Sequence, residues 1–305
     1  MSNTYRAVQY REHGDSSVLE LGERAVEEPG RGQVRLAVRA AGVNPFDWKV
    51  RKGLFGPGMP GKFPAVPGVD VAGVVEAVGP EVTEFAVGDE VLGAASGSYA
   101  EIALASAAGL VRKPDGMSWA DAAALNTGVT TAYRALGLLN LVPGETLLVD
   151  GAAGAVGSVA AQIAVGRGLT VIGTASEGNH QFLRSLGVIP VLYGDGLLDR
   201  VDAVGQIDAA LDASGRGNLP ALIELTGGTD RVITIADGQA GELGVRFTSG
   251  GSPDEAVPGA LAEGAALAAA GKLTLPVTTY PLADAAKAQD ESEAGHVRGK
   301  LVLLV

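Results

Sequence analysis

The chain of 305 residues suits about two domains, because single hydrophobic cores stop growing well below that length, and its 47% hydrophobic content can fill two cores. Its net charge of −12 provides no diffuse basic field, so neither nucleic acid nor an anionic membrane surface is expected as a partner. Without cysteine, disulfides, thiolate metal sites and a cysteine nucleophile are excluded, and the three histidines lack a paired metal-ligand spacing.

Up to about residue 118, the sequence predicts a compact, mostly antiparallel β domain. Short alternating or β-branched runs recur between glycines and prolines, among them QVRLAVRAAGV, VAGVVEAV and YAEIALA. The first residues, MSNTYRAVQYREHG, carry charge where a signal peptide is apolar, and no apolar run reaches the roughly 18 residues of a membrane-spanning helix. The expected location is therefore the cytoplasm.

Within this part, the segment AAGVNPFDWKVRKG predicts a short helix. Asn44 suits the N-cap, Pro45 the first helical position, Asp47 the first turn and Gly53 the position after the end. Capping alone could account for these polar residues.

From Ser118 to Leu139 the sequence predicts helix broken around Thr127 and Gly128, followed by alternating strands and helices. Such alternation predicts a doubly wound parallel sheet, the α/β Rossmann arrangement. The C-terminal strand GKLVLLV is expected to rejoin the first domain, so residues 1–120 with 275–305 form one domain and residues 121–274 the other. The expected parallel strands are Thr146 to Asp150, Leu169 to Ala175, Val188 to Tyr193, Ile207 to Ala213, Arg231 to Ala236 and Val245 to Ser249.

A glycine-rich turn joins the strand TLLVD to a helix. Gly151, Gly154 and Gly157 form G-x-x-G-x-x-G, a spacing variant of the dinucleotide-binding fingerprint. Glycines there let backbone N–H groups approach a pyrophosphate at a helix N-terminus, where the helix dipole favours negative charge. A purely structural tight turn is the alternative interpretation.

The end of the next strand indicates which dinucleotide is bound. NAD sites place Asp or Glu there to bind the ribose hydroxyls, but this strand ends in Ala175 and Ser176. A small polar residue leaves room for a 2′-phosphate, with His180, Arg184 or Tyr193 as donors, although Glu177 would repel it. This favours NADP(H) over NAD(H) and leaves both open.

Several segments together resemble the medium-chain dehydrogenase/reductase superfamily, and specifically its zinc-independent, zeta-crystallin-like quinone oxidoreductase branch. They are FPAVPGVDVAGVVEAVGPEVTEFAVGDEV, GSYAEIALA, LNTGVTTAYRAL, VDGAAGAVGS, VIGTASEGNHQFLRSLG and GHVRGKLVLLV, with the Asn44 segment, and they span nearly the whole chain. The resemblance implies a Rossmann domain, a GroES-like, mostly antiparallel β-barrel domain, and a homodimer.

Zinc alcohol dehydrogenases of this superfamily carry a metal-binding Cys where Asn44 stands and Gly-His-Glu where this chain reads PGVD, Pro67 to Asp70. The resemblance therefore implies no metal site and a chemistry that depends on coenzyme geometry and hydrogen bonds. A nicotinamide can deliver hydride to a quinone or an enone, because the negative charge develops on a conjugated oxygen that modest donors stabilise.

Candidate catalytic residues are Asn44, Asp47, Lys49 and Tyr99, each with a structural alternative in capping or packing. By the resemblance, the Asn44 segment lies beside the nicotinamide, backbone around Gly154 meets the pyrophosphate, and Ser176 and Tyr193 meet the adenosine phosphate. The full set of expected coenzyme-binding residues is Asn44, Thr130, Gly151, Gly154, Ala155, Val156, Gly157, Ser176, His180, Tyr193, Ile235 and Ala236.

The expected function is a metal-free, NADPH-dependent reductase of quinones or activated alkenes. Two alternatives stay open. One is an enoyl-thioester reductase, and the other is a non-catalytic NADPH-binding sensor or structural protein, because a fold and a fingerprint do not determine function.

Overall fold

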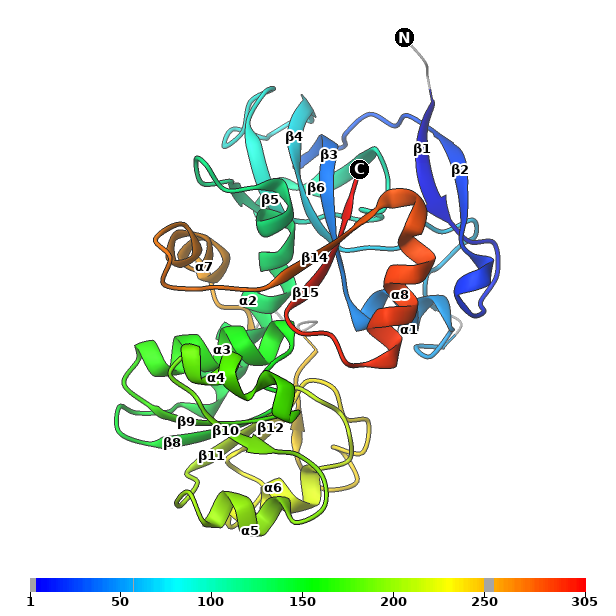
Figure 1. Cartoon of the computed structure of the whole chain (residues 1–305). Helices are drawn as coiled ribbons and strands as arrows, with labels where there is room; N and C mark the ends of the chain where they lie inside the picture. Colours follow the sequence, from blue (N-terminus) through cyan, green and yellow to red (C-terminus); the bar gives the residue numbers. More distant parts are fainter. Residues whose placement is uncertain (1–3, 57, 250–254) are drawn as a thin grey trace. The chain divides into compact units, whose positions relative to one another are not determined.

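A computed structural model describes residues 4–56, 58–249 and 255–305 and shows two compact units (Figure 1). The first comprises Met1–Thr127, Leu261–Lys272 and Pro276–Val305, and the second Gly128–Ala260 and Leu273–Leu275. Residues 261–272 lie in the first unit, whereas the sequence-based division placed them in the nucleotide-binding domain.

The first unit is built on a mostly antiparallel sheet around the long strand β3 (Gln33–Val43). This strand pairs antiparallel with β4 (Asp70–Val78), β6 (Ile102–Ser106) and β15 (Lys300–Leu304), so the C-terminal tail rejoins this unit as expected. The sheet order is β14-β15-β3-β4-β5-β7, in which β14 is Val277–Pro281, β5 is Glu90–Ala94 and β7 is Leu110–Arg112. In the first part of β3 every second residue, Val34, Leu36 and Val38, belongs to a core with Val71, Val75 and Val91, as strand geometry requires.

A separate antiparallel pair joins β1 (Thr4–Gln9) to β2 (Glu20–Ala25). Strand β2 is not among the strands that the sequence predicts, because its residues ELGERA are exposed or half-buried and therefore lack the apolar alternation that identifies a strand.

Helix α2 (Trp119–Leu139) is continuous, so the predicted break around Thr127 and Gly128 is wrong. Gly128 lies inside this helix, where a Cβ would be 3.4 Å from the Ala155 carbonyl oxygen, an ordinary van der Waals contact. The other helices of the first unit are α1 (Pro45–Arg51), α7 (Ala260–Ala269), α8 (Ala285–Ala294) and the 3₁₀ turns Ser16–Val18, Ala107–Gly109 and Leu282–Asp284.

The second unit contains a six-stranded, fully parallel sheet of order β10-β9-β8-β11-β12-β13. Helices α3 and α4 lie on one face and α5 and α6 on the other, which confirms the predicted doubly wound Rossmann architecture (Figure 1). The strands are β8 (Thr146–Asp150), β9 (Thr170–Ala175), β10 (Ile189–Leu192), β11 (Ala209–Asp212), β12 (Val232–Thr234) and β13 (Arg246–Phe247). The helices are α3 (Ala155–Gly166), α4 (His180–Ser185), α5 (Leu197–Asp202), α6 (Leu219–Thr226) and the 3₁₀ turn Glu177–Asn179.

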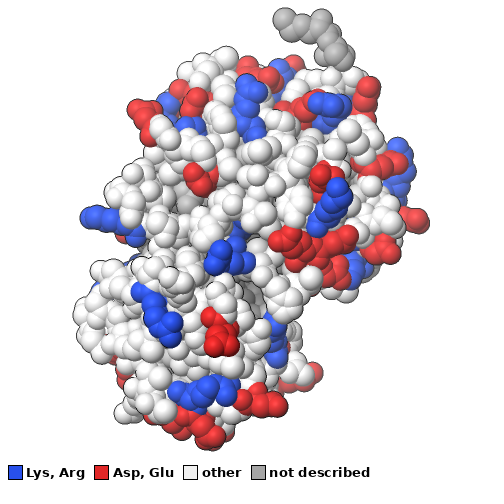
Figure 2. Space-filling view, viewed as in Figure 1, with Lys and Arg blue, Asp and Glu red and all other residues white. Residues whose placement is uncertain are grey.

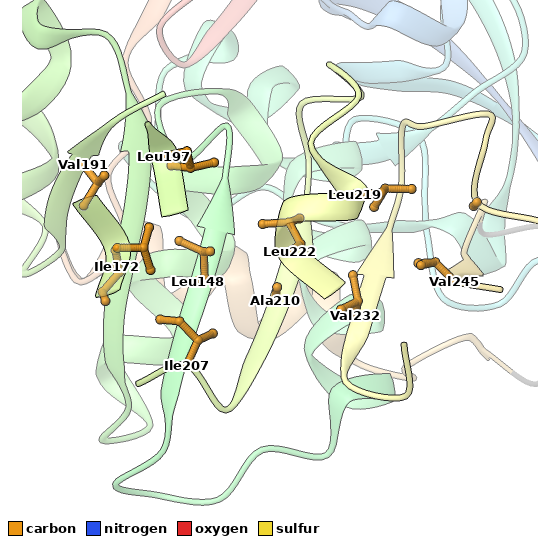
Figure 3. Close-up of a cluster of buried hydrophobic side chains, with 12 residues drawn as sticks. Leu148, Ile172, Val191, Leu197, Ile207, Ala210, Leu219, Leu222, Val232 and Val245 are labelled. Carbon is orange, nitrogen blue, oxygen red and sulfur yellow. The ribbon is translucent and has the colours of Figure 1, made fainter. Parts of the chain in front are cut away.

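One face of this sheet packs a buried aliphatic cluster under α5 and α6 (Figure 3). Leu148, Ile172 and Ala210 project from neighbouring strands, and Leu219 and Leu222 project from α6 onto them. Each fully buried leucine or isoleucine of this cluster contributes about 1.5–3 kcal/mol from burial, so the cluster stabilises the packing of α5 and α6 on the sheet.

On the face shown in Figure 2, acidic and basic side chains are interspersed, and the basic ones do not gather into one region. Among the described residues, no helix is long and apolar enough to span a membrane.

Candidate functional site

The glycine-rich turn of the second unit connects β8 to α3. Gly151 has φ +81°, a left-handed conformation that favours glycine, and a side chain at Gly157 would stand 2.3 Å from the Gly151 carbonyl oxygen. By contrast, a Cβ on Gly154, the N-cap of α3, would meet only the Gly151 carbonyl oxygen at 3.5 Å. Gly151 and Gly157 therefore shape the turn, while Gly154 leaves the start of the helix unobstructed.

The carboxylate of Asp150, at the end of β8, holds this turn in place. Thr174, near the end of β9, donates its hydroxyl to Asp150 and accepts the Gly151 N–H at 3.0 Å. On its other oxygen, Asp150 accepts the Ser214 hydroxyl and the Asn218 amide, the latter at 3.0 Å. Asp150 thus ties the glycine turn to the loop that follows β11.

A second buried carboxylate, Asp212, lies at the end of β11 and binds the loop after β11 and the end of β12. It accepts the backbone N–H groups of Ser214 and Gly215 at 2.8 and 2.9 Å and the Thr234 hydroxyl at 2.7 Å. The expected coenzyme residues Ile235 and Ala236 follow β12. Ile235 N–H donates to the Asp212 carbonyl oxygen at 3.0 Å, and Ala236 N–H donates to the Thr234 hydroxyl oxygen at 3.1 Å.

Three expected coenzyme residues follow β9 and β10. Ser176 starts the 3₁₀ turn after β9, and its hydroxyl oxygen accepts the Asn179 amide at 3.2 Å. His180 begins α4, with Nε2 buried and without a hydrogen-bond partner among the described residues. The ring of Tyr193, just after β10, lies 5.8 Å from the Arg216 guanidinium. Thr130 is half-buried in the part of α2 that belongs to the second unit.

In the first unit, Asp70 at the start of β4 is the centre of a buried polar cluster. Its Oδ2 accepts the Asn44 amide at 2.9 Å and the Lys300 ammonium at 2.7 Å. Its Oδ1 accepts the Asn126 amide at 2.8 Å and the Thr127 hydroxyl at 2.6 Å. Protein donors therefore satisfy both oxygens of the carboxylate, although the residue is not exposed to solvent.

Asn44 is held from both ends of its amide, because Lys300 donates to Oδ1 while Nδ2 donates to Asp70. Its backbone N–H donates to Asp47 Oδ2 at 2.9 Å, which closes a capping box at the start of α1. Asn44 is therefore both the N-cap of α1 and a member of the buried cluster around Asp70.

Asp47 also accepts the Tyr99 hydroxyl at 2.9 Å, so these two candidates lie together. Burial raises the pKa of Asp47 to about 7, against the lowering effect of the Asn44 N–H and the Tyr99 hydroxyl. Burial also raises the pKa of Tyr99 well above its ordinary value, with the Asp47 charge acting in the same direction. Tyr99 therefore stays a neutral donor at physiological pH.

Lys49, the fourth catalytic candidate, is placed differently. Its side chain is half-buried, and its ammonium lies 5.6 Å from the centroid of the Trp48 ring, where a cation–π contact is favourable. The structure thus brings Asn44, Asp47 and Tyr99 together and leaves Lys49 on the α1 surface.

Sequence reasoning missed Lys300, Asn126 and Thr127 as partners of Asn44 and Asp70. Lys300 lies 256 residues from Asn44 in the chain, and nothing in the local pattern of GKLVLLV marks its side chain as buried. Asp70 itself was noticed, as the residue at a lost metal-ligand position. Within residues 4–56, 58–249 and 255–305, no three His, Asp or Glu side chains are grouped to hold a metal ion.

Comparison with known proteins agrees with this architecture. Residues 30–115 match the alcohol dehydrogenase GroES-like domain family, and residues 191–303 match the zinc-binding dehydrogenase family. A mycobacterial protein whose structure was solved with NADPH is similar over 98% of this chain and 100% of its own, with a TM-score of 0.86 and 27% identity.

Several sequence relatives cover most of the chain. The pikromycin polyketide synthase component PikAII of Streptomyces venezuelae is 36% identical over 95% of this chain, which spans only 8% of that protein's length. Human quinone oxidoreductase is 36% identical over 80% of this chain and 76% of its own. The chain therefore belongs to the quinone oxidoreductase branch of the medium-chain dehydrogenase/reductase superfamily, as the sequence resemblance predicts.

Proposed function

We propose that this protein is a nicotinamide-dependent reductase that uses NADPH to reduce quinones or enones. The observation that carries the proposal is the open start of α3, where Gly154 bears no side chain and Asp150 and Thr174 hold the preceding turn. A pyrophosphate fits this cradle, because the first backbone N–H groups of a helix lack partners within the helix and the helix dipole favours an anion there.

The residues that would hold the coenzyme are the backbone of Gly154, Ala155 and Val156 for the pyrophosphate, and Ser176 and Tyr193 for the adenosine end. When bound, the reduced nicotinamide supplies a hydride to an electrophilic carbon. The remaining coenzyme residues proposed above, Thr130, His180, Ile235 and Ala236, are half-buried.

The buried cluster of the first unit is the proposed source of oxyanion stabilisation. Asn44 Nδ2 carries two N–H groups, of which Asp70 Oδ2 accepts one, so the other is suited to a substrate oxygen. The Lys300 ammonium on the amide oxygen polarises that donor. A preorganised donor of this kind stabilises the charge that develops on the oxygen of a quinone or an enone without a metal.

Tyr99 and Asp47 are proposed to support Asn44 rather than to act directly. The Tyr99 hydroxyl donates to the same Asp47 oxygen that accepts the Asn44 backbone N–H, which fixes the start of α1. Asp47 is also able to store a proton at neutral pH, because burial raises its pKa to about 7.

The test is NADPH oxidation in the presence of a panel of quinones and enones, with enzyme dialysed against a chelator in parallel. We expect turnover with at least part of the panel and equal rates before and after dialysis. Absence of turnover above the coenzyme blank across the panel contradicts the proposal, and loss of activity on dialysis contradicts its metal-free part.

An enoyl-thioester substrate is the second candidate, and one observation favours it. The polyketide synthase relative matches 95% of this chain, compared with 80% for the human quinone oxidoreductase at the same identity. Rates on a free enone and on its thioester, at equal concentration, separate the two substrates.

A homodimer is also proposed from the family resemblance, and light scattering on the purified protein tests it.

A further inference from the structure

Two side chains from distant strands meet above the carboxyl edge of the parallel sheet. Tyr193 follows β10 and Arg216 follows β11, and in the sheet these strands are separated by β9 and β8. Neighbouring strands lie about 4.8 Å apart, so the strands that precede Tyr193 and Arg216 lie about 14 Å apart. Their side chains nevertheless approach to 5.8 Å, between the guanidinium carbon and the ring centroid. The pair therefore extends over the ends of β9 and β8, where Ser176 and the glycine turn lie.

The loop that carries Tyr193 is held by hydrogen bonds from Arg200. The Arg200 guanidinium, from α5, donates to four consecutive carbonyl oxygens of the loop at distances of 2.8–3.3 Å. These carbonyls belong to Leu192, Tyr193, Gly194 and Asp195. One planar group with five donors thus fixes the backbone from which the Tyr193 ring projects.

The Arg216 side is held equally well. Arg216 N–H donates to the Ser214 hydroxyl oxygen at 3.2 Å, and Ser214 is in turn bound to Asp150 and Asp212. Gly215 has φ +62°, and a side chain there would stand 2.8 Å from the Ala236 carbonyl oxygen, so the conformation of this loop requires glycine at this position. The Arg216 side chain is exposed.

A positive charge above the ends of β9 and β8 is suited to binding a phosphate group of the coenzyme. The segment after β9, where the 2′ position of a bound dinucleotide lies, reads Ser176, Glu177, Gly178 and Asn179 and contains no lysine or arginine. Glu177 is exposed and adds a negative charge. A 2′-phosphate needs a positive partner, and Arg216 reaches toward this edge from the opposite side of the glycine turn.

We propose that Arg216 determines coenzyme specificity: its guanidinium, stacked on Tyr193 above the ends of β9 and β8, binds the 2′-phosphate of NADPH. Guanidinium binds phosphate through two parallel N–H donors, and a tyrosine face stabilises the same cation. This assignment rests on the proposed function, because it assumes that a dinucleotide occupies the glycine cradle.

The test is direct binding, measured by calorimetry, of NADPH, NADH, 2′,5′-ADP and 5′-AMP to the wild type and to Arg216→Gln. We expect Arg216→Gln to weaken NADPH and 2′,5′-ADP about tenfold or more, since a charge-assisted phosphate contact is lost, and to change NADH and 5′-AMP less than about twofold. Arg216→Lys should retain part of the preference, because it keeps the charge without the bidentate geometry. The matched control is Arg167→Gln, which removes another exposed arginine of the same unit that also lies against a tyrosine ring, that of Tyr133 at 5.4 Å.

Each outcome is decisive. An equal loss for phosphorylated and unphosphorylated nucleotides shows that Arg216 supports the loop only, and overturns the assignment while leaving the proposed function in place. Unchanged NADPH affinity in Arg216→Gln, or an equal selective loss in Arg167→Gln, overturns it as well. Binding of neither coenzyme by the wild type refutes the proposed function and the assignment with it.

Discussion

The ammonium nitrogen of Lys300 lies 2.7 Å from Oδ2 of Asp70, and the two side chains are 2% and 0% exposed. Burying two charges costs several kcal/mol per ion, and the cost is offset only where further donors and acceptors complete each group. Here Asn44, Asn126 and Thr127 supply them. The pair therefore depends on its surroundings, and removing one member leaves the other charge buried and uncompensated.

We accordingly expect Lys300→Met to lower the free energy of unfolding by about 3–5 kcal/mol, measured by urea denaturation. Removing the stranded charge as well, in Lys300→Met with Asp70→Asn, should recover part of this loss. Lys287→Met is the matched control, because Lys287 pairs with Asp284 at 2.8 Å on the surface, with the lysine side chain 71% exposed. That change should cost less than about 1 kcal/mol. Similar losses in the two single variants contradict the role given to Lys300.

Asp47 should make stability fall as the pH rises. Its pKa is raised from 3.8 in the unfolded chain to about 7 in the folded protein, mainly by burial. Between these values the folded state binds the proton that the unfolded state has lost, so the free energy of unfolding decreases with increasing pH. The decrease reaches at most about 1.4 kcal/mol per pH unit and stops above the folded pKa, where both states are ionised.

Asp47→Asn isolates this contribution, since asparagine stays neutral and keeps an oxygen to accept the Asn44 N–H and the Tyr99 hydroxyl. The measurement is the free energy of unfolding of both proteins from about pH 4 to about pH 8, where titrations of other groups cancel in the difference. We expect the wild type to lose stability relative to Asp47→Asn across that range. If the free energy of unfolding of the two proteins changes with pH in the same way, Asp47 is already ionised in the folded protein at low pH.

Local patterns predicted the strands of the second unit well, because each strand is signalled within a few residues. The strand TLLVD is followed directly by the glycine turn, and β8, α3 and β9 lie where the sequence indicated. The turn is informative because Gly151 needs a positive φ and Gly157 a close backbone approach, and glycine meets both needs.

Long-range contacts could not be predicted in this way. Asn44 was recognised as an N-cap, but its partners Asp70 and Lys300 come from β4 and β15, far away in the chain. Thr127 was interpreted as part of a helix break, because threonine and glycine are weak helix formers. In the structure, its hydroxyl binds the buried Asp70 and the helix continues, so tertiary contacts outweigh local propensity.

Substitution of Gly154 should weaken NADPH binding and leave the fold stable, whereas substitution of Gly157 should destabilise the fold. Gly154→Asp places a good N-cap residue where its Cβ meets only one atom, at 3.5 Å, so the melting temperature should be kept. Its carboxylate nevertheless occupies the anion cradle, and NADPH affinity should fall by more than about tenfold through like-charge repulsion. Gly157→Ala instead puts a methyl group 2.3 Å from the Gly151 carbonyl oxygen and should destabilise the fold by about 1–3 kcal/mol. Unaltered NADPH binding in Gly154→Asp, measured by calorimetry, would refute the pyrophosphate assignment.

Ser176→Asp should move coenzyme preference toward NADH. The new carboxylate stands at the end of β9, where NAD sites carry an acid that binds the ribose hydroxyls, and it repels a 2′-phosphate. The 3₁₀ turn should survive, because Asp at 176 can accept the Asn179 amide as the serine oxygen does at 3.2 Å. We expect the ratio of kcat/KM for NADPH to that for NADH to fall about tenfold or more, by loss of one phosphate contact and gain of repulsion. Ser176→Asn, similar in size and uncharged, should change the ratio much less, and equal shifts in the two variants would show that shape rather than charge at this position sets the preference.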